Sequence, residues 1–161
     1  MGFIFDREGR DDELRKDLDR ESRGLVTFTP RRMYENYLLN PHAIAVVTSK
    51  IKGFRTDGEI SSEEVERWMG EQGSDAKYFG KSAEPPARTD PSGLTDVHGT
   101  RLLEDLFFDL SEARVTYEKV AHGVELTRWL CDNARDDLED LAGLMVERLE
   151  QHERSTKESD A

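Results

Sequence analysis

Two acidic residues follow directly after a short apolar segment near the start of the chain. Residues 3–5 (Phe-Ile-Phe) lead into Asp6 and Glu8. Their spacing of two alone says little in a chain with 35 acidic residues. Their position after an apolar strand is more informative, because alternate residues of an extended segment point to the same side. Carboxylates at the carboxyl edge of a sheet are ligands of the type that Mg²⁺ prefers. We therefore predict that Asp6 and Glu8 bind Mg²⁺ or Mn²⁺ for phosphate chemistry. The alternative is that both are solvated loop acids, with Glu8 favouring the amino end of the next helix.

A third carboxylate lies in the aromatic-rich segment 30–41, after a second predicted strand. If the two strands are neighbours in one sheet, Glu35 approaches Asp6. We therefore predict that Glu35 is both a metal ligand and a catalytic residue. The alternative is a glutamate at a helix end that pairs with Arg31 or Arg32, and these arginines could equally contact phosphate.

A basic residue stands at the start of a leucine-rich predicted helix, in the sequence His98-Gly99-Thr100-Arg101. The amino end of a helix can bind an anion, and an arginine there can stabilise negative charge on a phosphoryl group. We predict this role for Arg101, with an exposed helix start as the alternative. The sequence has no zinc-binding HExxH or paired-cysteine pattern, no GxxxxGK[ST] loop and no GxSxG elbow, which excludes the corresponding enzyme classes.

The elements that must position these residues begin with a strand, a helix and a second strand. Residues 3–5 are predicted to form a short buried strand, 10–21 a surface helix with a narrow apolar stripe, and 25–28 another strand. This order predicts a βαβ unit with a parallel strand pair. Two parallel strands do not form a stable sheet by themselves. We therefore expect either that a partner supplies further strands or that the chain is a fragment.

The rest of the chain is predicted to be helical. Thr29 before Pro30 and Asn40 before Pro41 suggest two helix starts, and Ser61 with Glu64 matches a capping box. The predicted fold class is α/β and helix-rich, with a partial βαβ unit followed by a helical carboxyl-terminal region. We expect four stretches: 1–52 with the βαβ segment and the first following helix, 53–97 with the capped helix and a long mobile loop, 98–153 with the helical region, and 154–161 as a disordered tail.

The composition limits the partners that the protein can have. The 161 residues are 35% hydrophobic and 36% charged, with a net charge of -12, which fits one domain with a modest core. An acidic surface repels nucleic acid at long range, but a bound Mg²⁺ inverts the local field and allows contact with a phosphodiester. The sequence shows no membrane-spanning stretch or signal peptide. Its single cysteine, Cys131, excludes an internal disulfide, so we expect a cytoplasmic protein without a membrane partner.

The order of several segments resembles a known family. The segments FIFDREGR, FTPRRMYENYLLNPHAIA, DVHGTRLLEDLF and YEKVAHGVELTRWL resemble the carboxyl-terminal, Toprim-containing part of OLD-family (overcoming-lysogenization-defect) ATP-dependent endonucleases and related ABC-type ATPases, over residues 2–150 apart from the loop. The resemblance implies a Toprim-like βαβ unit and metal-dependent DNA cleavage in phage defence. It makes Asp6 and Glu8 the counterparts of a DxD pair and puts Glu35 in a segment that supplies a further acid in some relatives. Arg101 stands where relatives often carry a lysine.

The resemblance also implies an ATPase, as a further domain or a partner chain, and an early strand that carries a glutamate. This sequence contains neither ahead of Asp6. We therefore expect the carboxyl-terminal fragment of a Toprim-type, Mg²⁺-dependent DNA endonuclease, a hydrolase of phosphodiester bonds that binds DNA through its metal and is inactive alone. The alternative is a non-catalytic interaction module that docks on an ATPase partner. Either form allows a homo-oligomer.

Overall fold

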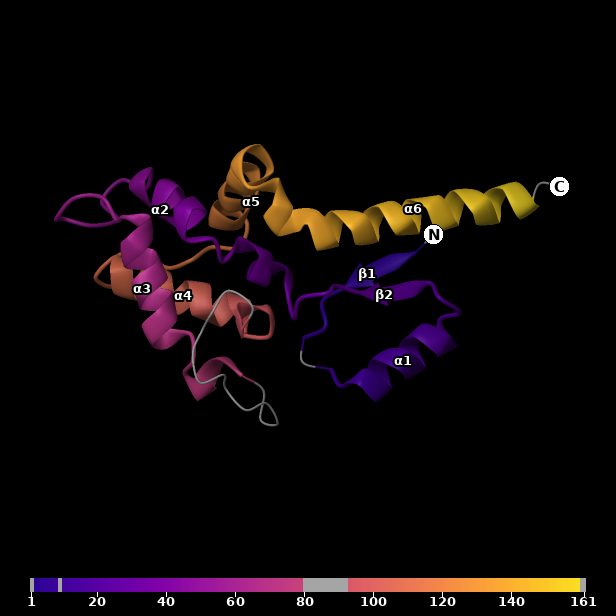
Figure 1. Ribbon diagram of the computed structural model, residues 1–161. Helices are drawn as coiled ribbons and strands as arrows, with labels where there is room; N and C mark the ends of the chain where they lie inside the picture. The colour runs from indigo at the N-terminus through magenta and orange to yellow at the C-terminus, as the bar shows by residue number, and fades with distance from the viewer. Residues whose placement is uncertain (1, 9, 80–92, 160–161) are drawn as a thin grey trace.

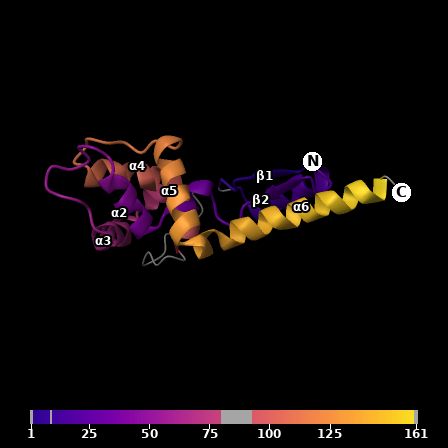
Figure 2. The same cartoon turned by 90° about the horizontal axis from the view of Figure 1, so that it is seen from above.

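The computed structural model describes residues 2–8, 10–79 and 93–159, and side chains as far as residue 152. It has an amino-terminal unit, a helical lobe and one long helix that leaves the lobe and runs alongside the unit (Figures 1 and 2). The unit consists of β1 (Phe3–Phe5), α1 (Asp12–Glu21) and β2 (Val26–Phe28). The lobe contains α2 (Pro41–Ser49), α3 (Ser62–Gln72), α4 (Gly99–Leu110) and α5 (Ala121–Asn133), and the long helix is α6 (Glu139–Ser159). Four 3₁₀ turns complete the described elements: η1 (Tyr34–Leu38), η2 (Ala76–Tyr78), η3 (Gly93–Thr95) and η4 (Arg135–Leu138).

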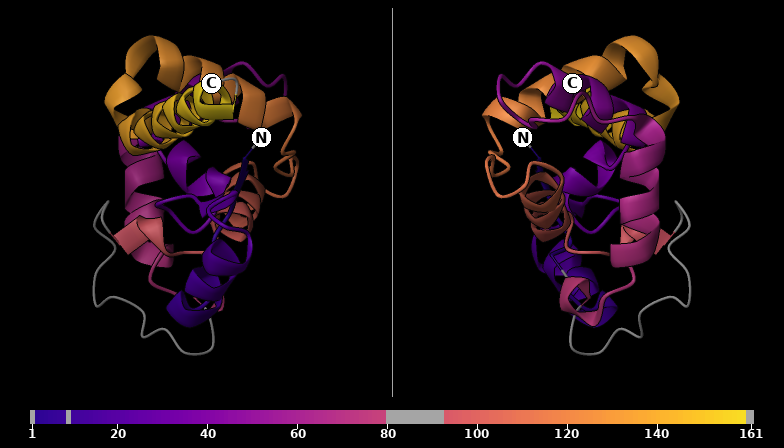
Figure 3. Two further views of the ribbon diagram at one scale, coloured as in Figure 1. Left: turned by 90° about the vertical axis from the view of Figure 1, so that its right-hand side faces the viewer. Right: turned by 90° about the vertical axis from the view of Figure 1, so that its left-hand side faces the viewer.

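The two strands form a parallel pair, with Phe3 opposite Val26 and Phe5 opposite Phe28. A helix-rich chain with a small parallel sheet is therefore confirmed, and these are the only two strands within the described residues. In Figure 1, α1 lies below the strands and α6 above them, and Figure 3 shows the same order end-on. The guanidinium of Arg148 on α6 donates to the carbonyl of Gly24, just before β2, at 2.7 Å. This contact ties the long helix to the unit.

The prediction that the first strand is buried is wrong. Phe3, Ile4 and Phe5 are 50%, 37% and 48% exposed. The core lies in the helical lobe instead, where the largest fully buried side chains include Ile44, Val65, Leu102, Leu106, Phe107, Leu126 and Leu130. The ring of Phe107 packs edge-on against Phe54 and Tyr117, with centroids 5.7 and 5.4 Å apart. Because apolar burial is the main stabilising term, the lobe provides most of the stability of the fold.

Local capping residues set the starts of three lobe helices. The side chains of Asn40 and Ser61 accept hydrogen bonds from the amides of Ala43 and Glu64, which confirms both predicted caps. His98 caps α4 in the same way. Since a side-chain acceptor satisfies an amide that the helix leaves without a partner, each cap fixes where its helix begins.

The prediction of a helix that begins after Thr29 is wrong. The amide of Thr29 still donates to the carbonyl of Phe5 at 2.9 Å, and its hydroxyl donates to the carbonyl of Arg31 at 2.8 Å. Strand pairing thus continues one residue past β2, and the chain bends at residues 30–33 before η1 begins.

The carboxyl-terminal end of the chain differs from its predicted form. The tail predicted to be disordered from residue 154 is helical as far as Ser159, as part of α6. The predicted mobile loop lies largely in residues 80–92, outside the described residues. None of the described helices combines the length and apolar character needed to cross a membrane.

Candidate metal centre

The predicted acidic pair lies where the two parallel strands end. The amide of Glu8 donates to the carbonyl of Arg32 at 2.9 Å, so the two segments that follow β1 and β2 stay side by side beyond the sheet. Asp6 and Glu8 both line a cavity of about 630 Å³ between β1 and α6, whose other walls include Tyr34, Thr127, Leu141 and Met145. Both residues thus lie along the wall of one cavity.

The third predicted carboxylate is buried. Glu35 is 4% exposed. Its Oε1 lies 2.8 Å from Nζ of Lys119. Its Oε2 is buried and accepts no hydrogen bond from any residue that the structure describes. A buried carboxylate oxygen in this state carries a free-energy cost of about 1–3 kcal/mol, which a cation or a proton would remove.

The turn that carries Glu35 is held firmly in place. The side-chain amide of Asn36 donates to the carbonyls of Leu94 and Val97 at 2.6 and 3.0 Å, and its oxygen accepts from the amide of Met33 at 2.9 Å. Gly99, the first residue of α4, packs directly against this turn. A Cβ at Gly99 would lie 2.9 Å from the amide nitrogen of Asn36 and 3.0 Å from Cβ of Glu35. Only glycine allows such a close approach.

Asp6 and Glu35 interact electrostatically, although one follows β1 and the other lies in η1. Burial raises the pKa of Asp6 above its ordinary value of 3.8, and repulsion from Glu35 raises it further. Glu8 adds a smaller effect in the same direction, whereas hydrogen bonding from the Tyr34 backbone and the charge of Lys119 oppose it. Asp6 and Glu35 thus lie near enough to each other for their charges to interact. Crowded carboxylates with a raised pKa are a frequent sign of a functional site.

Lys119 is the site residue that the sequence reasoning missed. It pairs with Glu35 from the segment before α5, and no local pattern links two residues so far apart in the sequence. The sequence suggested Arg31 or Arg32 as the partner of Glu35, but in the structure both arginines bond to other groups. Nη2 of Arg31 donates to the carbonyl of Asp137 at 2.9 Å, and Nη1 of Arg32 donates to the carbonyl of Asp96 at 3.1 Å.

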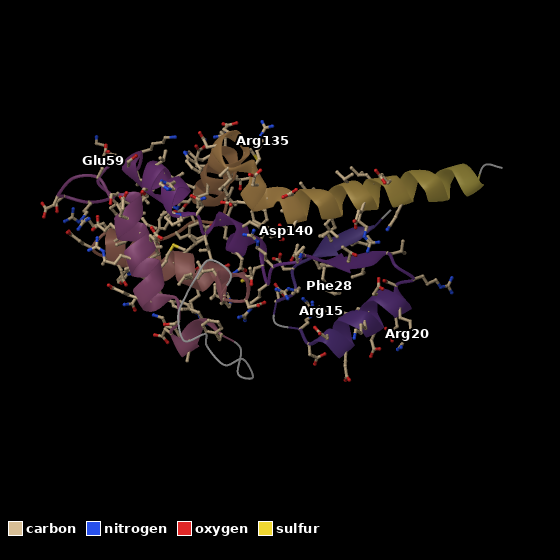
Figure 4. The ribbon with its side chains drawn as sticks, viewed as in Figure 1. Arg15, Arg20, Phe28, Glu59, Arg135 and Asp140 are labelled. Atoms are coloured by element: carbon tan, nitrogen blue, oxygen red, sulfur yellow. The ribbon has the colours of Figure 1, made fainter. Side chains whose placement is uncertain are left out.

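Arg31 instead ties η1 to the start of α6. Its guanidinium lies over the ring of Tyr37, 4.3 Å from the centroid, and its Nε is 3.6 Å from Oδ2 of Asp140. Figure 4 labels Asp140 where α6 begins, next to the η1 segment. This contact helps hold α6 over the cavity that Asp6 lines.

Glu8 lies at the edge of the site. Its Oε2 is 3.4 Å from Nη2 of Arg10. Its backbone has a φ of 47°, in the left-handed region, a conformation that costs a non-glycine residue about 1 kcal/mol or more. The hydrogen bond from the amide of Glu8 to the carbonyl of Arg32 holds this conformation in place.

Arg101 belongs to a different group of side chains. Its Nη1 donates to the carbonyl of Lys77 at 2.8 Å. Its charge acts on His98 and Arg32. Burial and then the charges of Arg32 and Arg101 lower the pKa of His98. Burial also lowers the pKa of Arg32, where attraction to Asp96 opposes the shift and the charges of Arg101 and Arg7 add to it. The structure shows no direct contact between Arg101 and the three predicted metal ligands within the described residues.

The donor atoms are of the right chemical type for Mg²⁺ but do not surround an ion completely. Within residues 2–8, 10–79 and 93–159, no three His, Cys, Asp or Glu side chains come close enough together to hold a metal. Mg²⁺ often binds through one or two carboxylates and completes its shell with water. Asp6 and Glu35 can supply such a pair, with the ammonium of Lys119 beside them. Comparisons of the chain with protein-family models, curated proteins and solved structures found no match.

Proposed function

We propose that this chain is the carboxyl-terminal part of a Toprim-type, Mg²⁺-dependent DNA endonuclease that works with an OLD-like ATPase in cytoplasmic phage defence. Asp6 and Glu35 would bind the metal and Glu8 would lie at the edge of its site, with Mn²⁺ as an alternative ion. The observation that carries the proposal is Oε2 of Glu35, which is buried, lacks a described partner and lies within electrostatic reach of Asp6. The family resemblance of the surrounding segments supports the same assignment.

Each side chain has a distinct role in this proposal. A bound Mg²⁺ would stabilise negative charge on the oxygens of the phosphodiester. Asp6 and Glu35 fix the position of the site from two segments of the chain, and Glu8 adds negative charge at its edge. Lys119 neutralises Glu35 when the site holds no cation. Arg101 would stabilise phosphate charge away from the metal ligands, because it belongs to a different group of side chains. A partner would supply the further acid that the resemblance implies, so we expect the isolated chain to be inactive.

Metal binding tests the site directly. Mn²⁺ is titrated into the wild type and into the Asp6→Asn and Glu35→Gln variants, with calorimetry as the readout. Glu59→Gln is the matched control, because Glu59 is exposed at the far end of the lobe (Figure 4). We expect both site variants to bind at least about ten-fold more weakly, since loss of one carboxylate costs more than about 1.4 kcal/mol, while the control binds like the wild type. Equal binding by the wild type and Glu35→Gln would contradict the proposal.

Cleavage tests the activity. An upstream Toprim strand with its glutamate is fused ahead of β1, and DNA cleavage is measured in Mn²⁺. We expect the fusion to cut and its Asp6→Ala variant to be inactive. If the fusion and this variant show the same background cleavage, the chain is not part of a nuclease of this kind.

A second candidate function is a non-catalytic module that docks on an ATPase partner. The observation that favours it is the exposed apolar surface on both sides of the 630 Å³ cavity. The β1 side chains are 37–50% exposed, and Met145 and Leu149 of α6 are 52% and 66% exposed. The backbone edge of β1 remote from β2 is free to pair within the described residues, so the occupant would be an extended apolar segment that adds a strand there. Carboxylates beside the cavity favour basic residues at the ends of this segment.

Co-purification distinguishes the two functions. A docking module would retain an ATPase partner, and Leu149→Asp, on the exposed face of α6 outside the cavity lining, would release it without changing Mn²⁺ binding. A chain that elutes as a monodisperse monomer without an ATPase would count against the docking function. A self-associating chain would show instead that a second copy takes the partner's place.

A further inference from the structure

Basic side chains gather beside the loop that precedes α4. Arg7 lies between Asp6 and Glu8 in the sequence, and its side chain reaches this loop. Its Nη2 is 2.7 Å from Oδ1 of Asp96. Arg32, which follows β2, points to the same region, because its Nη1 donates to the carbonyl of Asp96 at 3.1 Å. The segment that presents carboxylates to the cavity thus presents arginines to the loop before α4.

The amino end of α4 adds two more nitrogen-bearing side chains to this group. Nδ1 of His98 accepts a hydrogen bond from the amide of Arg101 at 3.3 Å, which leaves Nε2 of the neutral ring as a donor. Burial lowers the pKa of His98, and the charges of Arg32 and Arg101 lower it further. The contacts place the three residues together: the amide of His98 and Nη1 of Arg32 both donate to the carbonyl of Tyr78, at 2.7 and 3.1 Å, and Arg101 donates to the neighbouring carbonyl of Lys77.

The charges in this group do not balance. Arg7 is paired with Asp96, and Lys77 is paired with Asp105 at 2.8 Å. In contrast, Arg32 and Arg101 donate to backbone carbonyls and have no carboxylate partner within residues 2–8, 10–79 and 93–152.

Nearby acids attract these guanidinium groups without forming ion pairs with them. Asp96, which Arg7 already binds, acts on Arg32 more strongly than Arg101 does, and Asp105, which Lys77 binds, interacts with Arg101. Because both acids are shared with other cations, a bound anion would add attraction at Arg32 and Arg101.

We propose that Arg32, Arg101 and His98 form a phosphate-binding site that works without a metal ion, and that its ligand is the backbone of a DNA strand. Planar guanidinium groups match the geometry of phosphate oxygens. The amino end of α4, a helix of 12 residues, adds a favourable dipole. The DNA part of this inference rests on the proposed function, whereas the phosphate chemistry does not. Free inorganic phosphate is the other source of the same chemistry.

DNA binding in EDTA tests the site apart from any metal. The anisotropy of a short fluorescent DNA duplex is measured with the wild type and with Arg101→Gln over a range of salt concentrations. Arg20→Gln is the matched control, because Arg20 is an exposed arginine on α1 that pairs with Asp17 (Figure 4). We expect Arg101→Gln to bind roughly ten-fold more weakly, through loss of one charged hydrogen bond. The slope of log affinity against log salt concentration should fall in magnitude by about one, as expected for the loss of one phosphate contact. The control should match the wild type.

Two further measurements complete the test. Arg101 is exposed and makes one side-chain bond, to the carbonyl of Lys77, so its variant should fold; Arg32→Gln is a second variant, and thermal unfolding checks both. Inorganic phosphate should raise the melting temperature of the wild type more than that of either variant.

The outcomes separate the two proposals. Equal DNA affinities for the wild type, Arg101→Gln and Arg20→Gln would overturn the site. Stabilisation by phosphate without DNA binding would overturn the DNA ligand. Metal-free binding that depends on Arg101 would support the site even if the cleavage test fails, and that failure would then count against the proposed nuclease alone.

Discussion

The contact between α4 and η1 predicts a large difference between two identical substitutions. An alanine Cβ at Gly99 would lie 2.9 Å from the amide nitrogen of Asn36 and 3.0 Å from the carbonyl carbon and Cβ of Glu35. These atoms cannot move easily, because hydrogen bonds from the Asn36 side chain hold the turn. In Gly70, within α3, the same Cβ would meet nothing within 4 Å. We expect Gly99→Ala to be less stable than Gly70→Ala by about 1–3 kcal/mol, the usual cost of overpacking.

Urea unfolding followed by circular dichroism measures this difference. Gly70→Ala should be more stable than the wild type by about 0.4–1 kcal/mol, because alanine restricts the unfolded chain and favours the helix. Gly99→Ala should unfold at a lower urea concentration than the wild type with an unchanged slope. If the two variants are equally stable, α4 does not lie this close to η1, and the placement of Glu35 is then wrong as well.

The other predictions concern charge, a buried hydroxyl and the core. The raised pKa of Asp6 means that the folded state disfavours its ionised form, so its contribution to stability is present below the ordinary value of 3.8 and is lost as the pH rises through the folded pKa. Asp6→Asn should therefore stabilise the protein at neutral pH and have little effect below pH 3.8 in urea unfolding at the two pH values. A variant that is destabilised equally at both would contradict this reasoning. Tyr78 is fully buried and donates to Oδ2 of Asp105 at 2.7 Å, so Tyr78→Phe should cost about 1–2 kcal/mol. NMR titration should show the pKa of Asp105 rising in this variant, since hydrogen bonds from Lys77 and Tyr78 now outweigh the effect of burial; an unchanged titration would refute the assignment. Phe107→Ala should cost about 3–5 kcal/mol by thermal or urea unfolding, because its ring is fully buried in the lobe, and a loss below 1 kcal/mol would place the core elsewhere.

Features that depend on near neighbours in the sequence could be predicted. The caps at Asn40 and Ser61 are confirmed because each involves an amide three residues away. The parallel strand pair is confirmed because the short strand, helix and strand allow few other arrangements. Asp6 and Glu8 are two residues apart, and both line the same cavity.

Features that depend on distant segments could not be predicted in the same way. The apolar composition of residues 3–5 suggested burial, but burial depends on what covers a strand, and here the core forms among the lobe helices. The helix predicted after Thr29 fails because pairing with β1 continues there. Lys119 was missed because the sequence does not show which basic residue pairs with Glu35. The adjacent arginines, Arg31 and Arg32, bond to other groups.

The separation of the strands from the core has a consequence for the motions of the molecule. The helix α1 has no buried residue, and the β1 side chains are 37–50% exposed. Residues 3–28 therefore have little apolar contact that holds them folded against the rest of the molecule. Amide hydrogens in β1 and β2 should therefore exchange with solvent through local opening, faster than those of α4 and α5. Because Asp6 belongs to this less protected region and Glu35 to the lobe, each opening event separates the two carboxylates. Any ligand or partner that closes the region also assembles the pair.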